Sequence, residues 1–547
     1  MTQSTSPLEK QIPSNRLGEG LAVASLFVLV IFGTLLASDN LLSGPRIWDD
    51  NQIFRLELAL AERSFVDVFA EEQQRHSDNN RRLMPVFQAV KVLKAATYGD
   101  SVLAWKVHTG IVAVITSLLC FLFMRELGYK VLIAILFPLL GFLGPQSVTW
   151  WKVIHGDGLG MLFVSAALVG LARNVKRGGG RAELAFVVFA AAASLTKESF
   201  VLLLPGLGAL LVWLERLTNG GTWPEVVRRK QRALSALLVI FVAELVMIVL
   251  VMGTTTHYGY SGWSGLKLGQ LLTTTGQFLV VTQVWLLIPV GMSLAFVARS
   301  KHDLLYNVLA PGALVLAIVV SPQLMLYATT GFESTEENAF IMVPRYLLPI
   351  ALLPAFLLCD FSARLLDHAP DRRVAAALAV FACTILGWRG SEALAEAELH
   401  RKEVATLDRW YDTMREYTNT DDPILIILGI VNKDLYDTVR LRFLLEGYLG
   451  RQNIFFTYFP KAQHLDVVKR RVAEGKLRLR HDVARSLESM RTLDDLPDSA
   501  RLTAIVVPAR LEGEFRTAFS QTLDLRDAKR FEGPGEAVTI WPQRPVK

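Results

Sequence analysis

Two adjacent carboxylates, Asp49 and Asp50, follow Trp48 about ten residues beyond the first long apolar segment of the chain. That segment, 21–37, is long enough to cross a bilayer, which places the two acids at a membrane boundary. Carboxylates there are costly to desolvate, so a pair of them indicates a functional site. Either acid can accept a proton or bind a cation. The simpler alternative is that one caps a helix and the other accepts backbone hydrogen bonds in a loop.

Further polar clusters interrupt the later apolar segments: Trp151 with His155 and Asp157, the pair Lys197-Glu198, and the pair Arg345-Tyr346. Each cluster also has a purely structural explanation. The tryptophan could belong to an aromatic belt, the Lys–Glu pair could be a neutralised hairpin turn, and the arginine could anchor the start of a helix. We expect all of these groups on the same side of the membrane as Asp49.

These residue types together can move a proton and hold a phosphate. A carboxylate can deprotonate an incoming hydroxyl, and Arg and Lys side chains can stabilise a phosphate leaving group. Arg81 and Arg82, in the first external loop, are further candidates because arginine offers a permanent charge and a fixed fork of donors. The combination predicts glycosyl transfer from a polyprenyl phosphate outside the cytoplasm. The sequence contains no glycine-rich nucleotide loop, so a nucleotide sugar is not expected.

Composition supports a membrane protein. Hydrophobic residues make up 52% of the 547 positions and charged residues only 20%, and the mean hydropathy is +0.35. The formal charge of +6 does not indicate nucleic acid, because most basic residues cluster in alternate short loops, as a membrane topology requires. The three cysteines, Cys120, Cys359 and Cys383, lie in apolar segments and are expected to be small core residues.

The predicted fold class is a polytopic α-helical membrane protein with a C-terminal soluble α/β domain. About eleven apolar segments have the length expected of transmembrane helices. They are 21–38, 103–124, 130–144, 158–173, 182–196, 199–215, 233–252, 275–298, 304–326, 346–363 and 374–390.

The distribution of basic residues orients these spans. The short connections at 125–130, 173–181, 228–232, 299–301 and 364–373 carry Lys and Arg, whereas 327–344 carries neither. Basic loops face the cytoplasm. The sequence therefore predicts a cytoplasmic N-terminus with an uncleaved first span, in the plasma (inner) membrane. The carboxylate pair and, by parity, the C-terminal region are expected to be extracytoplasmic.

Two regions are expected to lie outside the spans. The external loop 39–102 contains two amphipathic segments, 51–70 and 83–96, that suit helices at the membrane surface. From about residue 391 the pattern predicts an α/β domain to residue 547. Its expected strands are 424–429, 453–458, 502–507 and 538–541, and its expected helices are 434–450, 462–478 and 512–523.

The chain resembles the GT-C superfamily of integral-membrane glycosyltransferases, and within it the protein O-mannosyltransferase and aminoarabinose-transferase-like group. Five motifs match in order: Trp48-Asp49-Asp50; Arg82-Leu83-Met84-Pro85 with Trp105 to His108; Trp151 to Leu159; Ser194 to Glu198; and Arg345 to Pro349. The match covers about residues 1–390, which the resemblance identifies as a transmembrane catalytic domain. The Arg-Pro motif carries an insertion, and His155 stands where the family commonly has Arg.

The resemblance implies a polyprenyl-phospho-sugar donor in the membrane, an acceptor hydroxyl on a protein or envelope glycan, and usually inversion at the anomeric carbon. It implies that Asp49 is the general base, with Asp50 beside it, and that Asp157 assists or binds a metal. Lys197 and Arg345 would contact the donor phosphate, with Arg81 and Arg82 as further candidates. Substrate-binding candidates are His108, Trp151, His155, Glu198 and Tyr346. Some family members use a divalent cation such as Mg²⁺ or Mn²⁺, for which Asp49 and Asp157 are the candidate ligands.

Two alternatives remain open from the sequence. A flippase or transporter for a lipid-linked glycan would place ionisable residues along a path near the bilayer midplane, often in repeated halves, whereas here they collect at one face and no repeat is found. A ligase or polymerase that moves a whole oligosaccharide from a diphosphate lipid differs only in its donor.

Overall fold

A computed structural model of the chain describes residues 16–45, 50–80, 83–252, 268–282, 284–297, 305–329, 348–368, 371–417, 424–428, 443–450, 454–458, 504–508, 529–531 and 538–542, with the single residues 470 and 517. The chain forms two compact units. The transmembrane unit comprises Met1–Ala37, Glu72–Val90 and Lys106–Ala397, and the second unit comprises Ser38–Glu71, Lys91–Trp105 and Glu398–Lys547.

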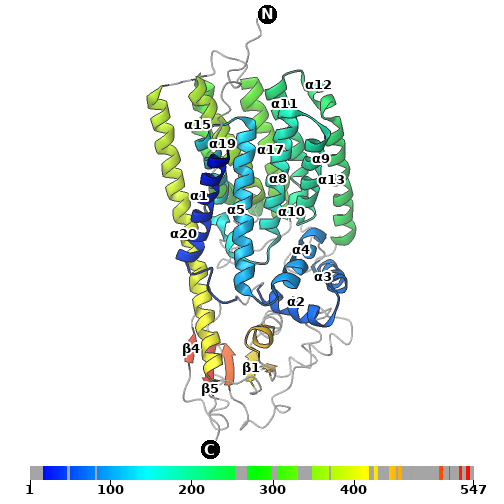
Figure 1. Cartoon of the computed structure of the whole chain (residues 1–547), viewed down its shortest axis with the longest axis vertical. Helices are drawn as coiled ribbons and strands as arrows, with labels where there is room; N and C mark the ends of the chain where they lie inside the picture. Colours follow the sequence, from blue (N-terminus) through cyan, green and yellow to red (C-terminus); the bar gives the residue numbers. More distant parts are fainter. Residues whose placement is uncertain are drawn as a thin grey trace, which may run out of the picture. The chain divides into compact units, whose positions relative to one another are not determined.

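Helices dominate the transmembrane unit, and its long members run side by side (Figure 1). In chain order they are α1 (Arg16–Ala37), α5 (Val102–Leu127), α6 (Val131–Phe142), the short η2 (Pro145–Ser147) and α7 (Val148–Trp151), α8 (Gly156–Arg177), α9 (Gly180–Ser194), α10 (Glu198–Val201), α11 (Leu204–Asn219), α12 (Trp223–Arg229), α13 (Gln231–Met252), α14 (Leu268–Thr282), η3 (Val284–Leu286), α15 (Leu287–Val297), η5 (Leu305–Leu309), α17 (Ala310–Thr329), α19 (Leu348–His368) and α20 (Arg372–Tyr417).

Fewer helices than predicted have full spanning length. Every predicted span contains a helix, but among the described residues only eight helices are long and apolar enough to cross a membrane. The helix α6 and the η2–α7 segment are bent by 78° at the break between them, and together they form either a ninth, broken span or a re-entrant loop. The helix α9 has 15 residues, which is about 22 Å at 1.5 Å per residue and less than the roughly 30 Å hydrocarbon core. The prediction that 182–196 and 275–298 are helical is confirmed. The helix in 182–196 is too short to span the membrane, and 275–298 contains the end of α14 followed by the separate helices η3 and α15.

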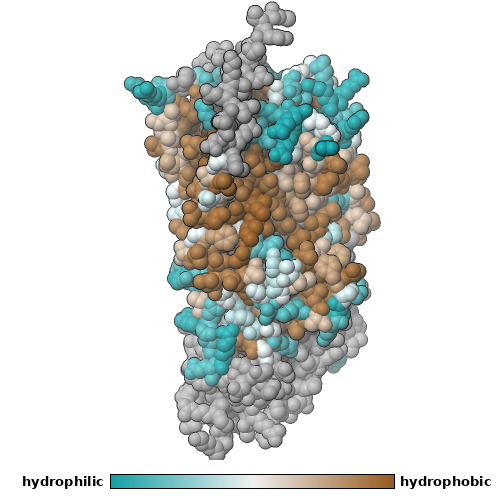
Figure 2. All heavy atoms as spheres, viewed as in Figure 1, coloured by the Kyte–Doolittle hydropathy of each residue, from teal (hydrophilic) through white to brown (hydrophobic). Residues whose placement is uncertain are grey.

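Apolar side chains cover the middle of the transmembrane unit, and hydrophilic residues lie at the end where α12 is found (Figure 2). Its interior is organised around Phe356 of α19. This ring packs 5.4 Å from Phe123 of α5, 6.2 Å from Phe137 of α6 and 6.2 Å from Trp213 of α11, measured between ring centroids. Large aromatic rings in tilted or edge-to-face contact fix the relative position of helices that lipid alone would not hold together.

The second unit combines helical segments with a sheet. Helices α2 (Asn51–Glu62), α3 (Phe65–Asn80) and α4 (Pro85–Tyr98) confirm that the segments 51–70 and 83–96 are helical. The part of α3 from Glu72 and the part of α4 up to Val90 belong to the transmembrane unit. The sheet has the strand order β2-β1-β3-β5-β4, formed by β1 (Ile424–Leu428), β2 (Ile454–Tyr458), β3 (Ala504–Pro508), β4 (Lys529–Phe531) and β5 (Val538–Pro542). Strand β1 is parallel to β2 and β3, and β5 is antiparallel to β3 and β4.

The four predicted strand positions coincide with β1, β2, β3 and β5 within one or two residues. The three-residue edge strand β4 was not predicted, because Lys529-Arg530-Phe531 is too short and too charged to stand out as an apolar run. Most of the predicted C-terminal helices lie outside the described residues. The long helix α20 continues without a break through residue 391, where the composition changes.

A close approach of α8 and α9 gives the first testable prediction. A Cβ at Gly170 of α8 would lie 2.8 Å from the backbone nitrogen and 3.0 Å from the Cα of Phe186 in α9. Backbone atoms cannot yield as a side chain does, so Gly170→Val should lower the free energy of unfolding by about 1–3 kcal/mol. Thermal unfolding of the purified protein in detergent measures the change.

The matched control is Gly276→Ala in α14, where a new Cβ meets open space. Alanine restricts the unfolded chain, so this variant should be neutral or more stable by up to about 1 kcal/mol. Equal destabilisation in the two variants would show that the α8–α9 contact is not what Gly170 provides.

Candidate functional site

A buried ion pair joins two of the residues selected from the sequence. Lys197 Nζ donates a hydrogen bond to Asp157 Oδ1 over 2.6 Å, and the two side chains are 8% and 2% exposed. Asp157 lies in the first turn of α8, and Lys197 immediately precedes α10 in an extended conformation. Two residues 40 positions apart are thus brought together at the beginnings of two helices. A carboxylate in the first turn of a long helix is itself stabilised by the helix dipole.

Small residues allow this contact. A Cβ at Gly156 would lie 3.0 Å from the carbonyl oxygen of Thr196, and one at Gly160 would lie 2.7 Å from Thr196 Oγ1. The turn is also tied to α4, because Val86 N donates to the carbonyl oxygen of Leu195 over 3.2 Å. The predicted Ser194–Glu198 turn therefore lies directly against the start of α8.

Two polar residues that the sequence reasoning missed support this turn from other helices. Ser194 Oγ lies 2.7 Å from Glu244 Oε1 of α13, and the side-chain amide of Gln323 in α17 donates to the carbonyl oxygen of Ser199. Glu244 is the one ionisable residue in the apolar run 233–252. An isolated acid inside a predicted span is a signal for a functional or supporting role, and it could have identified Glu244 from the sequence.

A buried arginine fixes the bend that leads into α8. Arg389 of α20 is fully buried and donates to Gln146 Oε1 over 2.7 Å and to Glu392 Oε2 over 3.0 Å. Its guanidinium lies against Gly144, whose φ of 104° and lack of a Cβ leave room for the charge. The Gln146 amide in turn donates to the carbonyl oxygens of Gly141 and Leu143. This network satisfies the broken backbone between α6 and α7.

Four further residues selected from the sequence lie in the transmembrane unit. Trp151 ends α7 and is buried, which differs from the exposed position expected of an aromatic belt. His155 is half-buried and stands at the N-cap of α8, Glu198 is half-buried in the first turn of α10, and His108 is half-buried in α5.

In the second unit, the segment that carries the carboxylate motif is anchored on its N-terminal side. Gly44 N donates to Asp408 Oδ1 over 3.1 Å, and Tyr411 Oη donates to the carbonyl oxygen of Pro45 over 3.3 Å. Both partners belong to the last turns of α20. On the other side of the motif, Asp50 stands at the N-cap of α2 and is 2% exposed. Its carboxylate makes no capping hydrogen bond to α2, so helix capping does not explain its burial.

Asp50 shares its surroundings with a second buried cation, Lys94 of α4. Burial lowers the pKa of Lys94 to about 7, and the charge of Asp50 opposes that shift. The ammonium group also lies 4.5 Å from the centroid of the Trp105 ring. Burial, with the charge of Asp50 next in importance, raises the pKa of Tyr411 well above its usual value. The charge of the Asp50 carboxylate thus acts on both the Lys94 amine and the Tyr411 phenol.

Six of the sequence-selected residues, Trp48, Asp49, Arg81, Arg82, Arg345 and Tyr346, lie outside the described residues. Among the residues that are described, no group of three His, Cys, Asp or Glu side chains is placed to hold a metal ion. The Asp157 carboxylate is already engaged by the Lys197 ammonium, which does not fit a metal ligand.

Comparison with known proteins identifies the fold. No protein-family model matches the sequence, and no curated protein matches it. The crystal structure of ArnT from Cupriavidus metallidurans in the apo state is similar to this chain, with a TM-score of 0.50 and 14% identity over 96% of this chain and 98% of that chain. The same ArnT bound to undecaprenyl phosphate gives a TM-score of 0.48 and 14% identity over 94% and 97%. The apo comparison shows that this chain has a fold similar to that of ArnT.

The buried ion pair gives a stability prediction. Lys197→Met should cost about 3–5 kcal/mol, because it leaves the Asp157 charge buried without its cation. The double variant Lys197→Met/Asp157→Asn removes both charges and should recover most of that loss. Thermal unfolding of the single and double variants measures the coupling between the two sites.

Arg177→Met is the matched control, because its ion pair with Glu126 is largely exposed on the arginine side. Exposed pairs contribute at most about 1 kcal/mol. If Lys197→Met were no more harmful than this control, the pair would not be buried as described.

The lowered pKa of Lys94 gives a pH prediction. Between pH 7 and the ordinary lysine value of about 10.5 the unfolded chain binds the proton that the folded chain has lost, so this residue makes stability rise with pH across that window. Lys94→Met should remove the rise. Asp50→Asn should lower the pKa of Lys94 further, because it removes the favourable charge. ¹³C NMR of the reductively methylated protein reports the titration, and an ordinary value for Lys94 would contradict its burial.

Proposed function

We propose that this protein is an integral-membrane glycosyltransferase of the GT-C type. It transfers a sugar from a polyprenyl-phosphate donor to an acceptor hydroxyl on a protein or envelope glycan. The single observation that carries the proposal is the buried Lys197–Asp157 pair at the starts of α8 and α10, in a chain with the fold of ArnT. Burying a cation and its carboxylate partner inside a membrane unit costs free energy, so the presence of such a pair favours a role in binding or chemistry.

In the proposed reaction Lys197 serves the donor phosphate. The leaving polyprenyl phosphate gains negative charge as the bond to the sugar breaks, and an ammonium group held in place stabilises that charge. Asp157 keeps the lysine oriented through its 2.6 Å contact. Arg345, Arg81 and Arg82 are proposed as further phosphate ligands, because the arginine fork matches phosphate oxygens.

Asp49 is proposed as the general base, with Asp50 as its neighbour. The base takes the proton from the acceptor hydroxyl, and the resulting oxygen attacks the anomeric carbon. The new carbon–oxygen bond forms as the sugar–phosphate bond breaks, with inversion, and free polyprenyl phosphate is released. Asp49 ends protonated and returns its proton to water. His108, Trp151, His155, Glu198 and Tyr346 are proposed substrate contacts.

The protein is proposed to act at the outer face of the plasma membrane. The apolar helices support an integral membrane protein, and the alternation of basic loops favours the plasma (inner) membrane with the reaction on the extracytoplasmic side. The C-terminal region 391–547, which includes the five-stranded sheet, is proposed to be an extracytoplasmic α/β domain that docks the acceptor.

Replacement of the proposed base tests the mechanism. Asp49→Asn keeps the size and hydrogen bonding of the side chain but cannot accept a proton, so turnover should fall by at least about 10²-fold while the protein still folds. Purified protein is assayed with monosaccharide polyprenyl phosphates and, separately, with oligosaccharide diphosphate lipids.

Asp50→Asn is the matched control, and it should lower turnover less than Asp49→Asn. A larger loss in Asp50→Asn would reverse the assignment of the base. Transfer only from diphosphate lipids would favour the ligase, and binding of donors without any transfer would favour a flippase or transporter.

A further inference from the structure

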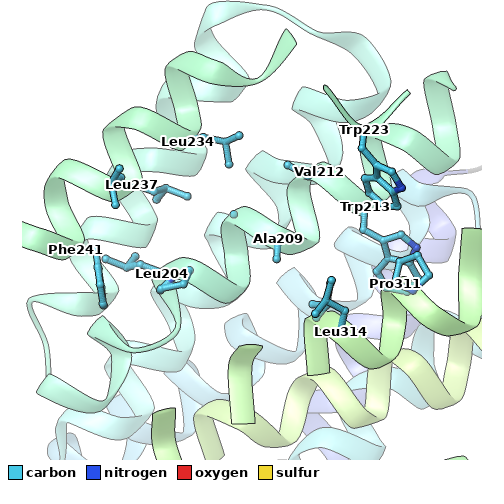
Figure 3. A pocket seen from close by; sticks show the side chains of 14 residues that line it. Leu204, Ala209, Val212, Trp213, Trp223, Leu234, Leu237, Phe241, Pro311 and Leu314 are labelled. Atoms are coloured by element: carbon cyan, nitrogen blue, oxygen red, sulfur yellow. The ribbon is translucent and has the colours of Figure 1, made fainter. Parts of the chain in front are cut away.

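Two cavities in the described part of the transmembrane unit differ in character. One, of about 390 Å³, is lined by apolar and aromatic side chains of α11, α12, α13 and α17. Trp213 and Trp223 lie together at one end of it (Figure 3). None of its lining residues is charged, so nothing in this cavity would select one hydrocarbon over another.

The second cavity, of about 700 Å³, is apolar along its length and basic at one end. Its apolar wall comes from α5, α8 and α9 and includes Leu119, Leu162, Phe163, Ala166, Val169 and Phe189. Phe163 and Phe189 stack with a centroid distance of 6.4 Å. The volume lies within the range of about 300–1,000 Å³ that is usual for small-ligand pockets.

The basic end is formed by Arg173, Arg177 and Arg181 around the turn Gly178-Gly179-Gly180. Glu126 of α5 pairs with two of them, at 3.0 Å from Arg173 Nε and 3.0 Å from Arg177 Nη2. Three guanidinium groups and one carboxylate leave a surplus of two positive charges. The first two glycines of the turn have φ of 65° and 94°, a backbone conformation that other residues rarely adopt.

The second cavity is long enough to cover one leaflet of a bilayer. The lining residues of α8 extend from Leu162 to Arg177, which is about 22 Å along the helix axis and more than the roughly 15 Å of a hydrocarbon leaflet. Guanidinium groups above an apolar groove between membrane helices suit an anionic lipid, with its phosphate among the arginines and an acyl chain along the groove.

We propose that this groove between α5, α8 and α9 is a binding site for an anionic phospholipid. The occupant is a lipid of the membrane itself, not the sugar donor, and the basic loop at its head places it in the cytoplasmic leaflet. Asp157 lies in the first turn of α8, and Lys197 follows three residues after the end of α9. A lipid bound here therefore braces the ends of α8 and α9 that are distant from the ion pair.

Native mass spectrometry of the purified full-length protein tests the site, with phosphatidylglycerol as the probe. Wild-type protein should retain phosphatidylglycerol and discriminate against phosphatidylcholine with the same acyl chains. Glycerol phosphate, which has no acyl chain, should not compete. Equal binding of the two lipids, or competition by glycerol phosphate, would overturn the proposal.

Two variants separate the head and tail contacts. Arg177→Gln/Arg181→Gln leaves the Arg173–Glu126 pair in place and should weaken phosphatidylglycerol binding by about 5-fold for each charge removed. Ala166→Trp fills the groove without changing a charge and should also displace the lipid. The control Arg228→Gln/Arg232→Gln removes two basic residues elsewhere in the same unit and should bind as the wild type does. Unchanged binding in the first two variants, or an equal loss in the control, would exclude this groove.

Discussion

The contact on which the rest of the candidate site depends is the buried hydrogen-bonded ion pair between Lys197 and Asp157. Removing two charges from water costs several kcal/mol for each ion, and their mutual attraction repays this only when the geometry is good. In the structure the first turn of α8 lies against the residues that precede α10. Gly156 and Gly160 allow this approach, because larger residues there would separate the two segments. Because a buried ion pair is often no more stabilising than apolar residues of similar volume, the presence of this one is readily explained by binding or chemistry.

The short and broken helices reflect a related requirement, which is that polar groups buried in a membrane must find partners. Backbone groups inside a membrane must be hydrogen-bonded, and irregular backbone is tolerated only where it is buried in protein. The break after α6 is satisfied by Gln146, which Arg389 holds in turn. The turn after α9 is satisfied by α4 at Leu195 and by Gln323 at Ser199. These supports come from helices distant in the sequence, so the polar turns and the surrounding bundle stabilise one another.

The sequence could predict the membrane class, the helical segments, four strands and the pairing partners of the main ion pair as separate candidates. It could do so because apolar length, strand alternation and charged residues between spans are local signals. It could not reveal that α9 is too short to span or that α6 and α7 are bent apart, because both depend on where helices break within an apolar run. Gln323 was missed for another reason: its partner is remote in the chain, and an uncharged amide does not stand out within an apolar run. Arg389 is the one charged residue of the predicted span 374–390, and this signal was overlooked. Glu244 did carry a local signal, as a single acid within a span, and was overlooked.

The most direct test of this account is the binding of undecaprenyl phosphate to the double variant Lys197→Met/Asp157→Asn. This variant removes both charges and leaves no uncompensated buried ion, so it should remain folded. Binding is measured by native mass spectrometry or by protection against thermal unfolding, beside the wild type. The account predicts a folded protein whose affinity for the lipid phosphate is at least tenfold weaker. Affinity equal to that of the wild type would contradict it, because the buried pair would then have no part in holding the phosphate.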